Sequence, residues 1–289
     1  MNNNPSPLRY PGGKASFYPR IREILKINNL LGSTYIEPFA GGAGLALRLL
    51  ISDDVSRIVI NDIDFHIYAF WYSVLHYTDE LCRLILTTKI DVVNHSRLKA
   101  IYNNGEQGDL LQSGFATFFL NRTNVSGVLN GGIIGGKNQN GPYKIDARFN
   151  KEELINRIRT IASYREKIML FNVDGFNVLS LPGVKHLHPS FVNFDPPYVG
   201  KGARLYRNSF NTNDHLELAR KILSCHRKWI VTYDVDPLIL KAYSKRRIGY
   251  LDVTYSVKKC QTAKEYIIFS NGLEIPDTIE TLTTNDSSL

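Results

Sequence analysis

The segment Asp195-Pro196-Pro197-Tyr198 constrains the fold of this chain most strongly, because it directly follows the apolar run at residues 191–194. The run predicts a buried strand, and two consecutive prolines cannot continue it, so the chain must leave the sheet at Asp195. Open α/β sheets bind ligands at the carboxyl ends of such strands. The carboxylate, the Pro196 carbonyl and the Tyr198 ring suit a planar amine. A strand followed by a purely structural turn is the alternative for so short a segment.

A second pattern, nearer the N-terminus, is typical of a nucleotide-binding turn. The strand expected at residues 34–37 ends at Glu37 and leads into Phe39, Gly41 and Gly44, after which a leucine-rich helix is expected. Glycines let a ligand approach the backbone, and a helix N-terminus presents unpaired amide groups. The next predicted strand ends just before Asp62, and an acid at that place holds ribose hydroxyls in α/β nucleotide sites. Taken alone, the glycine spacing is equally compatible with a structural turn.

Composition and charge are compatible with these two patterns. A chain of 289 residues can hold one large core, or a core with an inserted subdomain. The net charge of +8 favours a polyanionic partner without proving one. The cysteines, Cys82, Cys225 and Cys260, lack the spacing of a zinc site or a disulfide framework, which favours a reducing cytoplasm. No apolar run approaches the roughly 20 residues that cross a bilayer. We therefore expect a soluble cytoplasmic protein without a metal.

Hydrophobic periodicity predicts a sheet assembled from both ends of the chain, with helices between them. Helices are expected at residues 17–31, 65–86, 91–102, 151–164 and 215–225, and further strands at 57–60, 168–173, 229–233 and 266–269. We interpret residues 81–165 as a mainly helical insertion in a main domain formed by residues 1–80 and 166–276. Residues 277–289 are rich in Thr, Asn and Ser and are expected to form a mobile tail.

In their order along the chain, these motifs resemble the DNA adenine methyltransferases of the Dam type. The matching parts are the Asp-Pro-Pro-Tyr segment, the glycine-rich turn and Asp62. Residues 7–14 are similar to the aromatic-x-Gly-Gly-Lys opening of that family, and residues 171–176, 229–234 and 264–269 resemble its remaining strands. The resemblance spans residues 7–272. Four short motifs in the family's order are far more specific than any one of them.

The resemblance implies a Rossmann-like methyltransferase sheet, mixed and mostly parallel, with an inserted, mainly helical target-recognition subdomain. It implies site-specific transfer of a methyl group from S-adenosylmethionine to the exocyclic amine of an adenine flipped out of double-stranded DNA, in a bacterial or phage-infected cell. Asp195, Pro196 and Tyr198 would be the catalytic residues. The cofactor would contact Tyr10, Lys14, Glu37, Phe39, Gly41, Gly44, Asp62, Asp174, Phe176 and Asp195.

The insertion contains a basic, glycine-rich segment that suits DNA. Between residues 122 and 151, Asp146 is the single acid among several basic side chains. Arginine pairs well with guanine, and asparagine or glutamine with adenine. The candidate DNA-binding residues are Asn121, Arg122, Asn124, Lys137, Asn138, Gln139 and Lys144 in this segment, and Lys201, Arg204 and Arg207 after Tyr198. A solvated loop with a hairpin turn is the alternative for the first group.

Three other functions are compatible with parts of the pattern. A cytosine-amine DNA methyltransferase would use the same pocket, but Asp rather than Ser at position 195 favours adenine. A small-molecule or protein amide methyltransferase typically has Asn there. An inactive DNA-binding relative is disfavoured, since Lys14, Asp62, Asp195 and Tyr198 are all present. The insertion departs from the best-known Dam pattern, so a GATC target is not assumed.

Overall fold

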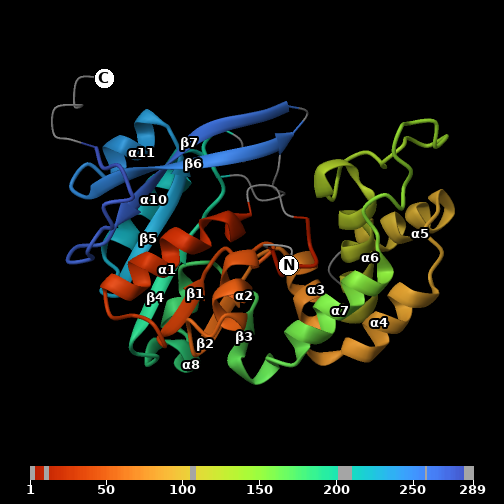
Figure 1. Ribbon diagram of the computed structural model, residues 1–289, viewed down its shortest axis with the longest axis horizontal. Helices are drawn as coiled ribbons and strands as arrows, with labels where there is room; N and C mark the ends of the chain where they lie inside the picture. Colours follow the sequence, from red (N-terminus) through yellow and green to blue (C-terminus); the bar gives the residue numbers. More distant parts are fainter. Residues whose placement is uncertain (1–3, 10–12, 105–108, 201–209, 258, 283–289) are drawn as a thin grey trace.

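A single seven-stranded sheet forms the centre of the protein (Figure 1). The computed structural model describes residues 4–9, 13–104, 109–200, 210–257 and 259–282, with the backbone alone for residues 253–263. The strand order is β3-β2-β1-β4-β5-β7-β6. The strands are β1 (Thr34–Glu37), β2 (Arg57–Asn61), β3 (Ile168–Phe171), β4 (Ser190–Phe194), β5 (Lys228–Asp234), β6 (Arg247–Val257) and β7 (Lys259–Phe269). Strands β1 to β5 are parallel, and β7 is antiparallel to both neighbours, which confirms the expected mixed, mostly parallel sheet.

The strand order reverses between β1 and β4, and this reversal locates the binding edge. Strand β1 pairs with β2 on one side and with β4 on the other. Connections therefore leave in opposite directions from the carboxyl ends of β1 and β4, which opens a crevice there. Glu37 ends β1, Asp195 follows β4, and Asp62 follows β2. The three sequence motifs thus meet at one edge of the sheet.

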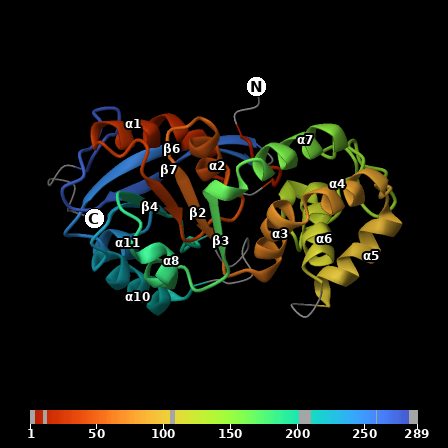
Figure 2. The same cartoon turned by 90° about the horizontal axis from the view of Figure 1, so that it is seen from below.

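Helices cover both faces of the sheet (Figure 2). On one face lie α1 (Tyr18–Ile27) and α2 (Gly44–Ile51), and on the other α8 (Pro182–Lys185), α10 (Thr212–Leu223) and α11 (Pro237–Ala242). Successive strand residues point to opposite faces. Tyr35 and Phe191 accordingly pack in the core beneath α1 and α2, whereas Ile36 and Val192 pack in the core on the opposite face. Both faces are buried, which explains the nearly continuous apolar runs of these strands.

The remaining long helices form a lobe beside the sheet (Figures 1 and 2). In the sequence they come between β2 and β3. They are α3 (Phe65–His76), α4 (Thr78–Thr87), α5 (Val92–Asn103), α6 (Leu110–Thr123) and α7 (Lys151–Ala162). The rings of Phe70 on α3 and Phe118 on α6 stack with centroids 5.7 Å apart. A domain boundary at residue 81 would cut α4 and separate α3 from α6, so the helical lobe begins instead at Phe65.

Several local expectations differ from the structure. The single helix expected at residues 65–86 is broken at Tyr77, which ends α3 and precedes α4. Helix α6 was not expected, because it is buried on nearly all sides and lacks an amphipathic period. Residues 277–282 do not form a mobile tail: the backbone N–H groups of Tyr250 and Leu282 donate to the carbonyls of Glu280 and Ile248, beside β6. Residues 283–289 lie outside the described residues.

None of the helices in the described part of the chain combines the length and the apolar character needed to span a bilayer.

Candidate active site

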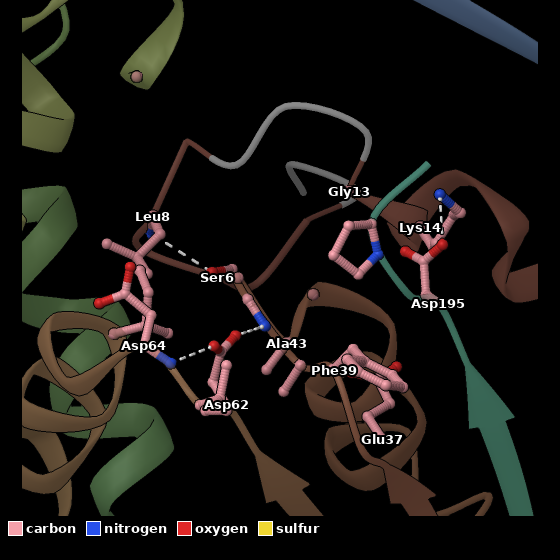
Figure 3. A pocket seen from close by; sticks show the side chains of 18 of the residues that line it. Ser6, Leu8, Gly13, Lys14, Glu37, Phe39, Ala43, Asp62, Asp64 and Asp195 are labelled. Atoms are coloured by element: carbon pink, nitrogen blue, oxygen red, sulfur yellow. Dashed lines mark hydrogen bonds and ion pairs between the residues drawn. The ribbon is translucent and has the colours of Figure 1, made fainter. Parts of the chain in front are cut away.

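A hollow of about 290 Å³ opens where the carboxyl ends of β1, β2 and β4 converge (Figure 3). Its walls come from the glycine-rich turn at residues 39–45, from Asp62 and from Asp195. The N-terminal segment contributes Lys14, and the helical lobe contributes residues 127–130. The hollow therefore lies between the sheet and the lobe, and it joins elements that are far apart in the sequence.

The glycine-rich turn is held in place by the acid that follows β2. Gly41 has a φ of 47°, a left-handed conformation that glycine adopts without strain. The Gly41 N–H donates to Asp62 Oδ2 at 2.9 Å, and the Asp64 N–H donates to Oδ1 at 2.9 Å. Burial raises the pKa of the Asp62 carboxyl to about 7. Each carboxyl oxygen has a second lone pair, so Asp62 fixes the turn and can still accept a hydroxyl from a ligand.

The Asp195 carboxylate is fixed from two sides. Thr232 on β5 donates from Oγ1 to Asp195 Oδ1 at 2.7 Å, and the Lys14 ammonium lies 3.0 Å from the same oxygen (Figure 3). Burial raises the pKa of Asp195, although the charge of Lys14 opposes this change. Its side chain remains 23% exposed toward the hollow. Within the described part of the chain, the donors that contact Asp195 all approach Oδ1. The other carboxylate oxygen, Oδ2, therefore remains open to a donor from a ligand.

Lys14 lies in a buried cluster with two carboxylates and a phenol. Its Nζ donates to Tyr198 Oη at 2.7 Å and lies 3.5 Å from Glu265 Oε2. The Tyr198 hydroxyl in turn donates to Glu265 Oε2 at 2.6 Å. Burial lowers the pKa of Lys14, but Asp195 and Glu265 outweigh it and raise the pKa overall. Lys14 is therefore charged, and it lies between Asp195, Glu265 and the Tyr198 hydroxyl at the border of the hollow.

Tyr198 is less accessible than its predicted stacking role requires. The residue is 8% exposed, and the Lys14 Nζ lies 4.9 Å from its ring centroid. The residue Pro196 is buried as well. Thr232 and Glu265 are site residues that the sequence did not single out, although both lie on predicted strands. Glu265 follows Lys264 and precedes the apolar residues 266–269 of β7, so its burial could not be recognised from its sequence neighbours.

The other residues predicted to bind the cofactor divide into two groups. Glu37, Phe39, Gly44 and Asp174 line the hollow. Phe176 is not part of this lining; it is half-buried, and its ring stacks on Phe194 with centroids 6.4 Å apart. Tyr10 lies outside the described residues.

Glu37 is the most deeply buried acid of the hollow. Its Oε1 accepts a hydrogen bond from Tyr35 Oη at 3.1 Å. Burial raises the pKa of Glu37 to about 8, so the carboxyl is protonated at neutral pH. Glu37 thus supplies a neutral polar group to the floor of the hollow.

Asn121, predicted to read bases, is instead a structural residue. It is 1% exposed, and its Oδ1 accepts from the Arg9 N–H at 2.7 Å. Its Nδ2 donates to the carbonyls of Arg9 at 3.0 Å and Gly127 at 2.9 Å. Gly127 has a φ of 75°, and a Cβ there would overlap the Arg9 carbonyl oxygen. Asn121 therefore ties the N-terminal segment to the helical lobe, and both N–H bonds of its amide are used within the protein.

Three further candidates of the insertion use their polar groups internally. Asn124 is buried, and its Nδ2 donates to the carbonyls of Val128 and Leu129. Gln139 accepts from the Ile145 N–H and donates to the Ile134 carbonyl, which closes the loop around it. Arg122 Nε donates to the Arg148 carbonyl at 2.7 Å, and burial lowers its pKa to about 10.

The exposed candidates of the insertion are Lys137, Asn138 and Lys144, although Lys144 Nζ also donates to the Gln139 carbonyl. The second basic group, Lys201, Arg204 and Arg207, lies outside the described residues.

The fold and the site together are those of an α/β protein with a nucleotide-type ligand site at the reversal of its strand order. The chain belongs to the D12 class N6 adenine-specific DNA methyltransferase family, which matches residues 10–257. The family is one of S-adenosylmethionine-dependent methyltransferases of adenine in DNA, which favours this function over the cytosine-amine and small-molecule alternatives.

Individual relatives are distant. The chain is 24% identical over 231 residues to the type II methyltransferase M.MjaIII of Methanocaldococcus jannaschii, covering 74% of this chain and 77% of that protein. A solved structure of PH1948 from Pyrococcus horikoshii has a TM-score of 0.42 and 9% identity, covering 91% of this chain and 87% of that one. The rRNA methyltransferase aviRa from Streptomyces viridochromogenes has a TM-score of 0.33 and 14% identity, covering 86% of this chain and 82% of that one.

Proposed function

We propose that Asp195 and the Pro196 carbonyl hold the exocyclic amine of an adenine extruded from double-stranded DNA. The observation that carries this assignment is the position of the Asp195 carboxylate, fixed by Thr232 and Lys14 at the end of β4 and open to the hollow beside the glycine-rich turn. A carboxylate accepts hydrogen bonds and cannot donate them, so it suits an amino group rather than a carbonyl oxygen.

The amine lone pair is delocalised into the adenine ring and is a weak nucleophile. Hydrogen bonds from its N–H groups to Asp195 and to the Pro196 carbonyl favour a pyramidal nitrogen with its lone pair directed away from the ring. Positive charge grows on this nitrogen during the reaction, so a fixed carboxylate interacts more strongly with the transition state than with the neutral amine. S-adenosylmethionine supplies the electrophilic methyl group on its sulfonium.

The residues of the hollow fit S-adenosylmethionine in their chemistry. Asp62 offers acceptor oxygens for ribose hydroxyls, and the glycine-rich turn with Gly41 and Gly44 allows close approach to the backbone. Phe39 offers an aromatic face, and Asp174 a further acceptor. Glu37 adds a neutral polar group below them. The assignment of Tyr10 rests on the resemblance alone.

Extrusion of the base follows from the depth of the site. Asp195 lies inside a hollow, which a base stacked in a duplex cannot enter. The lobe of α3 to α7 borders the same hollow, so we assign it to recognition of the DNA around the target. Lys137, Asn138 and Lys144 are its exposed polar candidates. Lys201, Arg204 and Arg207 would contact phosphates near the pocket. With such DNA as its substrate, the protein would act in the cytoplasm of a bacterial or phage-infected cell.

The test is incubation of the protein with S-adenosylmethionine and unmethylated duplex DNA, followed by mapping of every modified base. N6-methyladenine at one recurring sequence is expected. Asp195→Ala should lower the rate by about 100-fold or more, because one positioned electrostatic group is typically worth that much. A loss below about tenfold in the folded variant would remove Asp195 from the reaction. The same duplex with each A·T pair of the methylated sequence replaced by a G·C pair serves as the substrate control, because it removes the adenine amine and keeps a cytosine amine.

A further inference from the structure

Glu265 is a buried carboxylate next to the reaction centre, and the mechanism above does not use it. It lies on β7, beside Asp234 of β5, and is 1% exposed. Its Oε2 accepts a hydrogen bond from Tyr198 Oη at 2.6 Å and lies 3.5 Å from Lys14 Nζ. A carboxylate is rarely buried unless it is paired, so these contacts offset the cost of burying Glu265.

Lys14 is shared between two carboxylates at similar distances. Its Nζ lies 3.0 Å from Asp195 Oδ1 and 3.5 Å from Glu265 Oε2. Coulomb attraction varies inversely with distance, so neither carboxylate holds the ammonium alone. The Tyr198 hydroxyl bridges the group, because it accepts from Lys14 and donates to Glu265. Lys14 is therefore in contact with both carboxylates and with the hydroxyl that bridges them.

This sharing affects the charge that Asp195 presents to its substrate. A single lysine paired only with Asp195 would neutralise much of its charge and weaken it as an acceptor for the amine. A second carboxylate in contact with Lys14 opposes this neutralisation. We propose that Glu265 is a positioning residue for methyl transfer: it divides Lys14 between two carboxylates, so that the cluster keeps a net negative charge beside the amine. The proposal rests on the assigned role of Asp195 at the amine.

The first test is Glu265→Gln, which keeps the shape of the side chain and an acceptor for Tyr198 but removes the charge. We expect the single-turnover rate of DNA methylation to fall about tenfold or more, because the transition state loses electrostatic stabilisation. The affinities for S-adenosylmethionine and for DNA should change less than about threefold. Glu265→Asp keeps the charge and should recover at least half of the loss on a logarithmic scale.

Asp54 provides a matched control. It is also a buried carboxylate with a cation and a tyrosine as partners: Arg22 Nε lies 2.7 Å from Oδ1, and Tyr18 Oη donates to Oδ2 at 2.7 Å. Asp54 does not line the hollow. Asp54→Asn should therefore lower the urea midpoint of unfolding, while the methylation rate per folded molecule stays within about twofold of the parent.

The second test asks whether Glu265 acts through Lys14. In a Lys14→Met background, the ammonium through which Glu265 is proposed to act is absent. Glu265→Gln should then change the rate less than about twofold, although the same substitution changes it about tenfold in the parent. Such non-additivity is the signature of a shared contact.

Several outcomes would overturn the proposal. They are a parental rate in folded Glu265→Gln, an equal loss in the Lys14→Met background, or a loss explained entirely by weaker binding of S-adenosylmethionine or DNA. If Glu265→Gln does not fold, Glu265→Asp takes its place, because it retains the charge. A Glu265→Asp rate as low as that of Asp195→Ala would then overturn the proposal. If Asp195→Ala is inactive while Glu265→Gln is fully active, only the role of Glu265 fails, and the proposed function stands.

Discussion

Replacing Asn121 tests the distinction between a base-reading residue and a structural one. Its side chain makes hydrogen bonds of 2.7, 3.0 and 2.9 Å to the backbone of Arg9 and Gly127. At a net value of about 1 kcal/mol each, Asn121→Ala should lower the free energy of unfolding by about 3 kcal/mol. The loss is larger where water does not reach the abandoned backbone groups, because a buried unpaired group costs about 1–3 kcal/mol.

The assay is urea unfolding followed by circular dichroism, with methylation of a randomised duplex pool measured in parallel. Asn138→Ala is the control, since Asn138 is an exposed asparagine of the same lobe. The control should unfold within about 0.5 kcal/mol of the parent. For Asn121→Ala we expect lower stability and lower activity on all sequences alike. An unchanged urea midpoint together with a new target preference would refute the structural role and restore Asn121 as a base reader.

Two further variants test the hollow itself. Thr232→Val removes the 2.7 Å hydrogen bond to Asp195 Oδ1. The single-turnover rate should fall about 10- to 100-fold, as expected for the loss of a hydrogen bond to a charged group. Unchanged kinetics would show that Lys14 alone positions Asp195. The pKa of Glu37 is raised from 4.5 to about 8, so the folded protein holds a proton that the unfolded chain releases in this window. Its contribution to stability is complete below pH 4.5 and is lost as pH rises to about 8, at about 1.4 kcal/mol per pH unit. Glu37→Gln should remove this slope from urea unfolding measured at pH 5 to 8, and an identical slope in the variant would show that Glu37 titrates normally.

Local sequence was sufficient to predict the framework of the site. Continuous apolar runs predicted the parallel strands, because strands buried on both faces need no polar alternation. Asp62 and Asp195 were placed correctly, since an acid directly after such a strand must lie at the binding edge. The proline pair after Asp195 and the glycines after Glu37 mark their turns by backbone chemistry alone.

The tertiary structure alone decided which side chains meet. Lys14 and Tyr198 are 184 residues apart, and Tyr198 and Glu265 are 67 residues apart, yet they form one cluster. Asn121 has the composition of a base-reading residue, but α6 is buried among the other helices and turns its amide toward Arg9. Such contacts depend on the packing of separate elements, whereas a sequence pattern reports only the neighbours of each residue along the chain. Hence the sequence predicted a carboxylate at the binding edge, and only the folded chain shows the lysine and the second carboxylate that lie beside it.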